Sequence, residues 1–349
     1  MPKRLIVCSD GSWYTPDLKD RGVYCPSNVV KIARTIAPMA GDGTPQIVFY
    51  DQGVGTDWGM DRITGGAFGR GLSKNIQDAY RFLVHNYESG DQIYFFGFSR
   101  GAYTVRSCTG MIRNSGLLHK RHAGKIQQAF DLYRSKDVHP DDPPAREFRE
   151  RYAREVRIHF IGVWDTVGAL GVPLWGLNAL TRRYHEFHDV QLSRSIDNAF
   201  HALAIDEKRK AFRPTIWETK EVEYQRVEQA WFPGSHANVG GGFVDAGLSD
   251  QALKWMMDRA TQCDLEFEAD AQLELVEPNP LGELRNSRTW FFKLIPAFLR
   301  KIDAKISSQE RIDQSALTRM AERNLQYEPK NLLEFLTERK ALESKGSGD

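Results

Sequence analysis

The chain has 349 residues, 41% of them hydrophobic, and its 47 basic and 46 acidic side chains leave a net charge of +1. A charge so close to zero excludes the strongly basic surface of a dedicated nucleic-acid binder, so we expect no nucleic-acid partner. The length accommodates one large α/β domain with insertions, or two smaller domains. Because no run of 18 apolar residues occurs, we expect no transmembrane helix.

The N-terminal stretch and the cysteines bear on where the protein is expected to reside. The first apolar stretch is too short for the core of a signal peptide, and no small-residue cleavage site follows it. We therefore expect a cytoplasmic location, with signal-less secretion as an open alternative. The four cysteines form no C-x-x-C pair and match neither a zinc site nor a disulfide framework, so we expect reduced thiols. They are Cys8, Cys25, Cys108 and Cys263.

Short apolar runs alternate with longer helical patterns in the first 264 residues. This alternation predicts an α/β fold with a mostly parallel central sheet flanked by helices. The predicted strands are residues 4–8, 46–50, 92–97, 156–163 and 227–232. The predicted helices are residues 28–36, with Ser27 as N-cap, 72–87, 102–111 and a helix-like segment at 200–209.

Other segments interrupt this pattern. The glycine-rich residues 64–72 lack the ending of a P-loop, and we interpret them as a flexible loop near the mouth of the site. The charge-rich residues 120–154 predict a helical insertion. After a catalytic domain at 1–264, we expect a C-terminal helical lid or extension at 265–340 and a disordered tail at 341–349.

Residues 97–101 read Gly-Phe-Ser-Arg-Gly and stand between a predicted strand and a predicted helix. That context is typical of a nucleophile elbow, in which Ser99 is held at the apex of a tight turn. The aspartate that ends a later strand, Asp165, is placed to orient an imidazole. Asp206 and Glu207 also precede the histidine and are alternative acids. His236 follows a further strand, so serine, acid and histidine occur in the order that α/β-hydrolases use.

Several motifs together carry a family resemblance. They are residues 10–13 (Asp-Gly-Ser-Trp), 53–56 (Gly-Val-Gly-Thr), 97–103 (Gly-Phe-Ser-Arg-Gly-Ala-Tyr), 164–167 (Trp-Asp-Thr-Val) and 233–236 (Pro-Gly-Ser-His) with the triple glycine at 240–242. From about residue 3 to about residue 260, the chain resembles the bacterial and fungal α/β-hydrolase domain family that includes the phospholipase effectors of type VI secretion. The resemblance implies that Ser99, Asp165 and His236 are nucleophile, orienting acid and general base. Related sequences usually carry aspartate where this chain has Asn238, which puts in doubt a charged or metal-linked role of that position.

An acyl-transfer site also needs an oxyanion hole. The amide of Arg100 follows the nucleophile, and Gly11 and Ser12 lie in the loop after the first strand, where this fold places its second donor. An ordinary strand-to-helix turn is the alternative interpretation of that loop. We also expect substrate contacts from Trp13 and from the Arg100 guanidinium, which could instead form a buried ion pair that braces the elbow.

The segment at 287–301 combines aromatic and aliphatic residues with flanking basic ones. It suits contact with an anionic membrane surface or a lid over an acyl pocket, whereas packing onto the domain is the structural alternative. The favoured function is a serine hydrolase that cleaves carboxylic esters, with lipid or phospholipid esters implied by the resemblance, and without metal or organic cofactor. A non-catalytic binding module, a peptidase and a thioesterase remain alternatives, and we expect the lid and the 120–154 insertion to decide between acyl groups.

Overall fold

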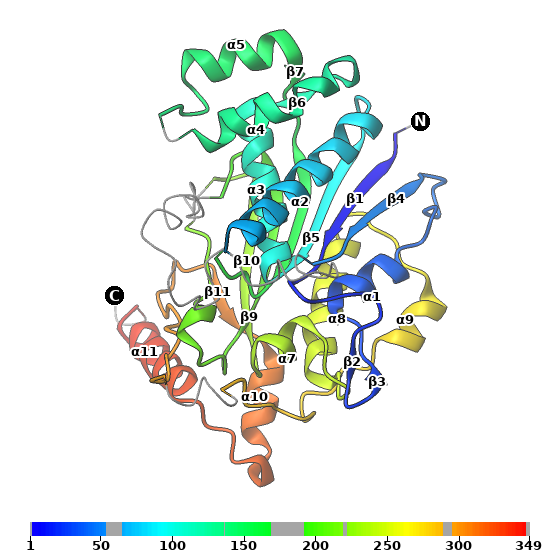
Figure 1. Ribbon diagram of the computed structural model, residues 1–349. Helices are drawn as coiled ribbons and strands as arrows, with labels where there is room; N and C mark the ends of the chain where they lie inside the picture. Colours follow the sequence, from blue (N-terminus) through cyan, green and yellow to red (C-terminus); the bar gives the residue numbers. More distant parts are fainter. Residues whose placement is uncertain are drawn as a thin grey trace.

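The computed structural model describes residues 2–53, 65–135, 137–168, 192–218, 222–288 and 295–346 (Figure 1). Its centre is a seven-stranded sheet in the order β11-β10-β9-β8-β5-β1-β4, in which all neighbouring strands are parallel. The strands are β1 (Arg4–Ser9), β4 (Gln46–Asp51), β5 (Gln92–Phe98), β8 (Ile158–Trp164), β9 (Ile196–Ala204), β10 (Arg226–Phe232) and β11 (Glu310–Ile312). Two short antiparallel pairs stand apart from it, β2 (Lys19–Asp20) with β3 (Val23–Tyr24) and β6 (Leu117–Leu118) with β7 (Ala153–Arg154).

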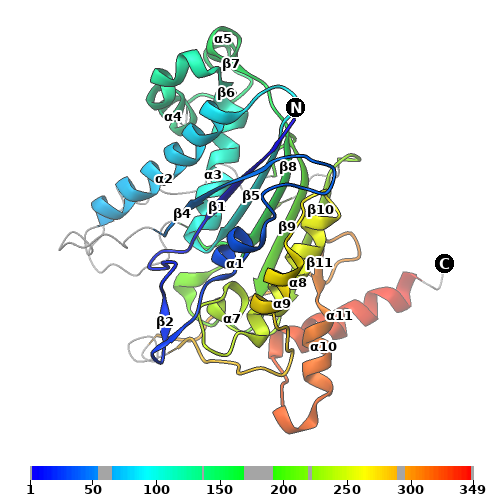
Figure 2. The same ribbon diagram turned by 90° about the vertical axis from the view of Figure 1, so that its right-hand side faces the viewer.

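Helices cover both faces of the sheet, which is the layered arrangement expected of the predicted α/β fold. The helices of the described residues are α1 (Asn28–Thr35), α2 (Gly65–Asn86), α3 (Arg100–Ser115), α4 (Ile126–Arg134), α5 (Pro143–Tyr152), α7 (His236–Gly240), α8 (Gly247–Thr261), α9 (Ala269–Leu275), α10 (Gln314–Ala321) and α11 (Lys330–Gly346). Short 3-10 turns lie at Lys120–Lys125, Lys210–Phe212 and Arg323–Leu325. Figure 2 shows α2 and α3 on one side of the sheet and α1 and α8 on the other.

The two faces of the sheet carry separate apolar clusters. In β1, Leu5 and Val7 pack with α2 and α3, whereas Ile6 and Cys8 pack with α1 and α8. A parallel strand that is buried on both faces reads as a continuous apolar run. The predicted parallel sheet is therefore confirmed, and each of the five predicted strands agrees with the structure to within two residues at either end.

The helix at 28–36 is also confirmed. It forms α1, and Ser27 caps it because the Ser27 hydroxyl accepts a hydrogen bond from Val30 N at 3.2 Å. The helix expected at 102–111 forms the middle of α3. All four cysteines are buried free thiols.

Two predicted segments were wrong. Residues 200–209, expected to be helical, begin inside β9, which runs to Ala204 and is paired with β8 and β10. The alanines of this stretch favour helix locally, but burial between two strands overrides that preference. The glycine-rich loop at 64–72 is also wrong from Gly65 onward, because α2 begins there, and residue 64 lies outside the described residues.

The chain after residue 264 is part of the same layered structure. Within it, β11 extends the sheet beside β10, and the buried Trp231 indole donates to Glu310 Oε2 at 2.8 Å. Leu332 and Phe335 of α11 pack with Leu203 and Trp231 in a third apolar cluster. The expected helical extension therefore also carries a strand of the central sheet. Among the described residues, no helix combines the length and apolar character needed to cross a bilayer.

The tail expected to be disordered from 341 is helical as far as Gly346, where α11 ends. An ion pair between Arg339 and Glu343, one turn apart at 3.0 Å, supports this last part of the helix. The remaining residues, 347–349, lie outside the described residues.

The 120–154 insertion is helical, as expected, and contains α4 and α5. It packs on the C-terminal half of α3, where Ser115 Oγ donates to Ala129 O at 2.8 Å. Figure 1 shows α4 and α5 at the end of the sheet where the strands begin. The carboxyl ends of the strands, with α7, lie at the opposite end, so the insertion does not border the site described below.

Candidate active site

Ser99 lies in a sharp turn between β5 and α3. Its backbone has φ 56° and ψ −116°, a conformation that costs energy for any residue except glycine. The turn depends on two glycines: a Cβ at Gly97 would lie 2.7 Å from Ala102 N, and one at Gly101 would lie 2.0 Å from Ser9 O. The same contact at Gly101 brings the first turn of α3 against the end of β1. The geometry is that of a nucleophile elbow.

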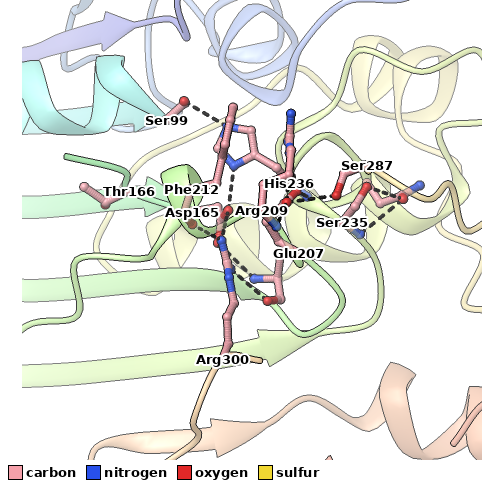
Figure 3. A network of polar contacts seen from close by, with 12 residues as sticks. Ser99, Asp165, Thr166, Glu207, Arg209, Phe212, Ser235, His236, Ser287 and Arg300 are labelled. Carbon is pink, nitrogen blue, oxygen red and sulfur yellow. Dashed lines mark hydrogen bonds and ion pairs between the residues drawn. The ribbon is translucent and has the colours of Figure 1, made fainter. Parts of the chain in front are cut away.

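His236 begins α7, directly after β10 and a short turn. Its Nε2 lies 2.9 Å from Ser99 Oγ, and its Nδ1 lies 2.5 Å from Asp165 Oδ2 (Figure 3). The structure therefore brings together the three residues that the sequence singled out. All three are buried, with 4% of Ser99 and of His236 exposed and none of Asp165.

The Asp165 carboxylate is held from several directions at the end of β8. Its backbone also has positive φ, at 38°, and its amide donates to Ala202 O at 2.7 Å. Oδ1 accepts a hydrogen bond from Ala204 N at 3.1 Å, so the neighbouring strand β9 fixes the carboxylate plane. His201 of β9 accepts from Thr166 N at 3.1 Å, and burial lowers the pKa of His201 to about 3, which keeps that imidazole neutral.

Arg300 is the residue that sequence reasoning missed. Its Nη1 lies 2.6 Å from Asp165 Oδ1 and its Nη2 lies 3.0 Å from Oδ2, a two-pronged ion pair that is buried on both sides. It comes from the C-terminal segment, 135 positions from Asp165. In the sequence, Arg300 is one of the basic residues that flank the aromatic segment. Apart from its charge next to Phe298 and Leu299, no feature of the sequence distinguishes it.

The two alternative acids serve the loop that carries His236 rather than its ring. Asp206 Oδ2 accepts from Gly234 N at 2.7 Å and from the Tyr327 hydroxyl at 2.8 Å. Glu207 Oε2 accepts from the His236 backbone amide at 3.2 Å, and Ser287 Oγ donates to Oε1 at 2.8 Å. Asp165 alone of the three carboxylates contacts the imidazole.

The charges of the site keep the acid ionised and the imidazole neutral. Burial alone would raise the pKa of Asp165, but the Arg300 guanidinium and the hydrogen bond from His236 outweigh burial and hold that pKa well below its usual range. Burial lowers the pKa of His236, and its contact with Asp165 opposes this only in part. A neutral imidazole beside a hydroxyl can accept a proton.

Aromatic rings enclose the imidazole. The ring centroids of Phe98 and His236 lie 4.6 Å apart, and Phe212 meets the same ring edge-on at 4.9 Å. Gly240 allows Phe98 to take this place, because a Cβ at Gly240 would lie 2.0 Å from the Phe98 ring. These apolar side chains keep water away from the imidazole, which explains the lowered pKa of His236.

The two expected oxyanion donors after β1 differ in the structure. The Gly11 amide donates to Asp10 Oδ1 at 2.7 Å and is therefore engaged within the loop. Ser12 is buried, and its hydroxyl has no hydrogen-bond partner among the described residues. Asp10 anchors the loop through contacts from the Ser27 hydroxyl at 2.6 Å and the Tyr50 hydroxyl at 2.9 Å.

The expected substrate-binding residues are Trp13, which belongs to this loop, and Arg100, which begins α3. Trp13 has φ 72°, and 42% of its surface is exposed. Arg100 is buried, and desolvation lowers its pKa to about 10.

Of the segment at 287–301, residues 289–294 lie outside the described residues. Its described ends pack on the domain, since Phe298 N donates to Lys208 O at 2.8 Å.

Asn238 joins the histidine loop to the C-terminal segment. Its Oδ1 accepts from Ser235 N at 3.2 Å and from Arg285 N at 3.1 Å, and its Nδ2 donates to Glu283 O at 2.9 Å. This role needs both a donor and an acceptor, which an aspartate would not supply.

The described residues hold no group of three or more His, Cys, Asp or Glu side chains that could bind a metal ion.

A parallel sheet with a serine elbow, an imidazole and a carboxylate at its carboxyl edge defines the class of α/β-hydrolase-like proteins. A family model described as the catalytic domain of Tle1-like phospholipase effectors of the type VI secretion system matches residues 3–259. The chain belongs to this family. Asp165, Ser99 and His236 lie inside the matched region, whereas Arg300 lies outside it.

Three individual proteins show how far the similarity to this chain extends. An uncharacterised protein of Saccharomyces cerevisiae is 30% identical over 234 residues, which are 60% of this chain and 32% of that protein, so the chain spans about a third of this relative. An uncharacterised protein from Pseudomonas aeruginosa is 15% identical with a TM-score of 0.47, over 80% of this chain and 49% of that one. The Tle1 effector, solved bound to the VgrG spike, is 15% identical with a TM-score of 0.48, over 80% of this chain and 77% of that one.

Proposed function

We propose that this protein is a serine hydrolase that cleaves carboxylic esters through an acyl-enzyme, with Ser99 as nucleophile. One observation carries the proposal: a continuous chain of hydrogen bonds links Ser99 Oγ to His236 at 2.9 Å and His236 to Asp165 at 2.5 Å. This series of hydrogen bonds begins at a hydroxyl on a strained turn and ends at a carboxylate that stays ionised. Both properties suit nucleophilic catalysis at neutral pH.

In the first step, Ser99 Oγ attacks the ester carbonyl and His236 Nε2 accepts the hydroxyl proton. Asp165 accepts a hydrogen bond from Nδ1–H and remains ionised, which fixes the imidazole tautomer and stabilises the imidazolium. The tetrahedral intermediate collapses by breaking the bond to the alcohol, and His236 gives the proton to the leaving oxygen. Water then attacks the acyl-enzyme while His236 accepts a proton from it. The bond to Ser99 Oγ breaks, His236 returns the proton to that oxygen, and the carboxylic acid leaves.

The negative oxygen of the intermediate requires hydrogen-bond donors. We assign this role to the backbone amide of Arg100, in the first turn of α3, and to Ser12, through its amide or its hydroxyl. The contact of Gly101 with the end of β1 supports this pairing, because it holds the Ser12 loop against the elbow. The amide of Gly11 instead serves Asp10.

The family supports lipid esters as the substrate class, with phospholipid acyl esters as the specific proposal. The exposed Trp13 ring, next to Ser12 in the chain, suits contact with an acyl chain or with a membrane surface. The acyl preference is expected to depend on this side of the molecule, because the 120–154 insertion lies at the other end of the sheet.

Labelling with a fluorophosphonate tests the proposal, together with hydrolysis of short-chain esters, long-chain esters and phospholipid vesicles. Wild-type protein is expected to label and to hydrolyse at least one ester, and Ser99→Ala is expected to lose both. Ser195→Ala is the matched control, because Ser195 lies before β9 at the opposite end of the sheet and is expected to keep both. Folded wild-type protein that neither labels nor hydrolyses any ester would overturn the proposal.

A further inference from the structure

The Arg300 guanidinium forms the most complete buried ion pair of the site described above. Two of its nitrogens face the two oxygens of Asp165, and the same nitrogens donate to Ala204 O at 2.8 Å and to Phe212 O at 2.6 Å. Both partners are almost entirely buried. Two-pronged pairing of this kind fixes the plane of a carboxylate as well as its charge.

Four hydrogen bonds from three residues leave the Asp165 carboxylate a single orientation. Oδ1 accepts from Ala204 N and Arg300, and Oδ2 accepts from Arg300 and His236. Without the guanidinium, one hydrogen bond from β9 and one from the imidazole would remain. A buried carboxylate that loses its cation also retains an uncompensated charge.

The charge of Arg300 also acts on His236 through the shared carboxylate. Asp165 favours the imidazolium, and a cation on the same carboxylate weakens that attraction. The other charged groups around the imidazole are Glu207, whose charge also favours the imidazolium, and Arg209, whose charge opposes it. Arg209 is paired with Glu207 at 2.9 Å, so the charges of these two side chains oppose each other at the imidazole. Asp165 is the charged group that contacts Nδ1, and Arg300 acts on the ring through that carboxylate.

Building on the proposed function, we propose that Arg300 is a positioning residue that orients Asp165 and keeps His236 neutral, so that the C-terminal segment completes the active site. The proposal rests on the two-pronged contact between the Arg300 guanidinium and the Asp165 carboxylate, and on the burial of both side chains. It places an essential group outside residues 3–259, the region that the family model covers.

The test compares Arg300→Gln and Arg300→Lys in the full chain. Arg300→Gln is expected to lower kcat about 100-fold with little change in KM, because the acid loses its fixed orientation. The acid limb of the pH profile is expected to move to higher pH, since removing the cation favours the imidazolium. Arg300→Lys restores the charge without the fork, so it is expected to return the acid limb towards wild type while kcat stays reduced.

Arg319→Gln is the matched control. Arg319 is another buried arginine of the same segment, and its guanidinium donates to Pro280 O and Gly282 O, both at 2.9 Å. Its loss is expected to lower stability without moving the acid limb. Thermal unfolding of each variant identifies a change that is merely structural.

A second readout needs no turnover. Histidine NMR titration of wild type and Arg300→Gln measures the pKa of His236 directly, and we expect it to rise in the variant and to stay unchanged in Arg319→Gln. An unmoved His236 titration in folded Arg300→Gln, or an equal shift in Arg319→Gln, overturns the inference. Because this readout is independent of ester hydrolysis, it decides the role of Arg300 even if the proposed function fails.

Discussion

The two parts of the chain that meet at the site contribute to it in different ways. Residues 3–259 contribute through tight backbone turns, with positive φ at Ser99 and Asp165 and glycines that permit close approach. The segment after residue 264 contributes through long side chains that reach inward, above all Arg300. Tight turns can be recognised in a sequence by their glycines and their fixed spacings. A long side chain that enters the site from a distant segment can be recognised only by its residue type. A family motif therefore shows the first contribution and not the second.

The sharpest way to break this comparison is to remove the acid itself. Asp165→Asn is expected to lower kcat about 10⁴-fold, because the amide can donate to the imidazole and hold it in the wrong tautomer. Asp206→Asn is the matched variant, since Asp206 contacts Gly234 N and Tyr327 but not the ring. It is expected to lower kcat less than about 10-fold. Steady-state kinetics with the best ester measures both, and a larger loss in Asp206→Asn would reverse the assignment of the acid.

The comparison also predicts how the molecule unfolds. Leu332 of α11 is fully buried against the sheet, and Leu332→Ala is expected to lower the free energy of unfolding by about 2–5 kcal/mol. Because β11 belongs to the sheet, urea unfolding followed by tryptophan fluorescence and by circular dichroism should show one coincident transition. An early separate transition in the variant would mean that the C-terminal segment is an independent unit.

A smaller effect is expected at the contact between the two regions. Asn238→Asp keeps the acceptor for Ser235 and Arg285 but loses the donor to Glu283 O. The unpaired carbonyl and its repulsion from a carboxylate are expected to cost about 1–3 kcal/mol of stability. Urea midpoints of the variant and of wild type measure this cost. Equal midpoints would show that Glu283 O finds another donor.

Much of the central sheet could be predicted because its strands are continuous apolar runs between turn residues. Two strands of the sheet were missed, β9 and β11. The first, β9, contains Ala199, Ala202 and Ala204, whose local preference is helical and whose burial between neighbours only the fold shows. The last strand, β11, has three residues and reads Glu-Arg-Ile, too short for any periodicity. Its place in the sheet comes from pairing with β10.

The site could be predicted to the level of its three central residues, because each follows a strand. Their side-chain partners could not. Nothing in the spacing links Asp165 to Arg300. Gly11 and Ser12 were named together as oxyanion donors, because a sequence does not show that Asp10 accepts a hydrogen bond from the Gly11 amide. Hydrogen-bond partners are decided by three-dimensional packing, which local patterns do not contain.

The pair between Asp165 and Arg300 also sets an order of assembly during protein synthesis. Residue 165 leaves the ribosome 135 residues before its cation does, and until then the carboxylate has no buried counter-charge. Taking a lone carboxylate out of water is costly, so this corner of the sheet cannot close fully on a partial chain. A nascent chain therefore carries its serine and histidine before the acid is locked in place, and the site is complete only once residue 300 has been added.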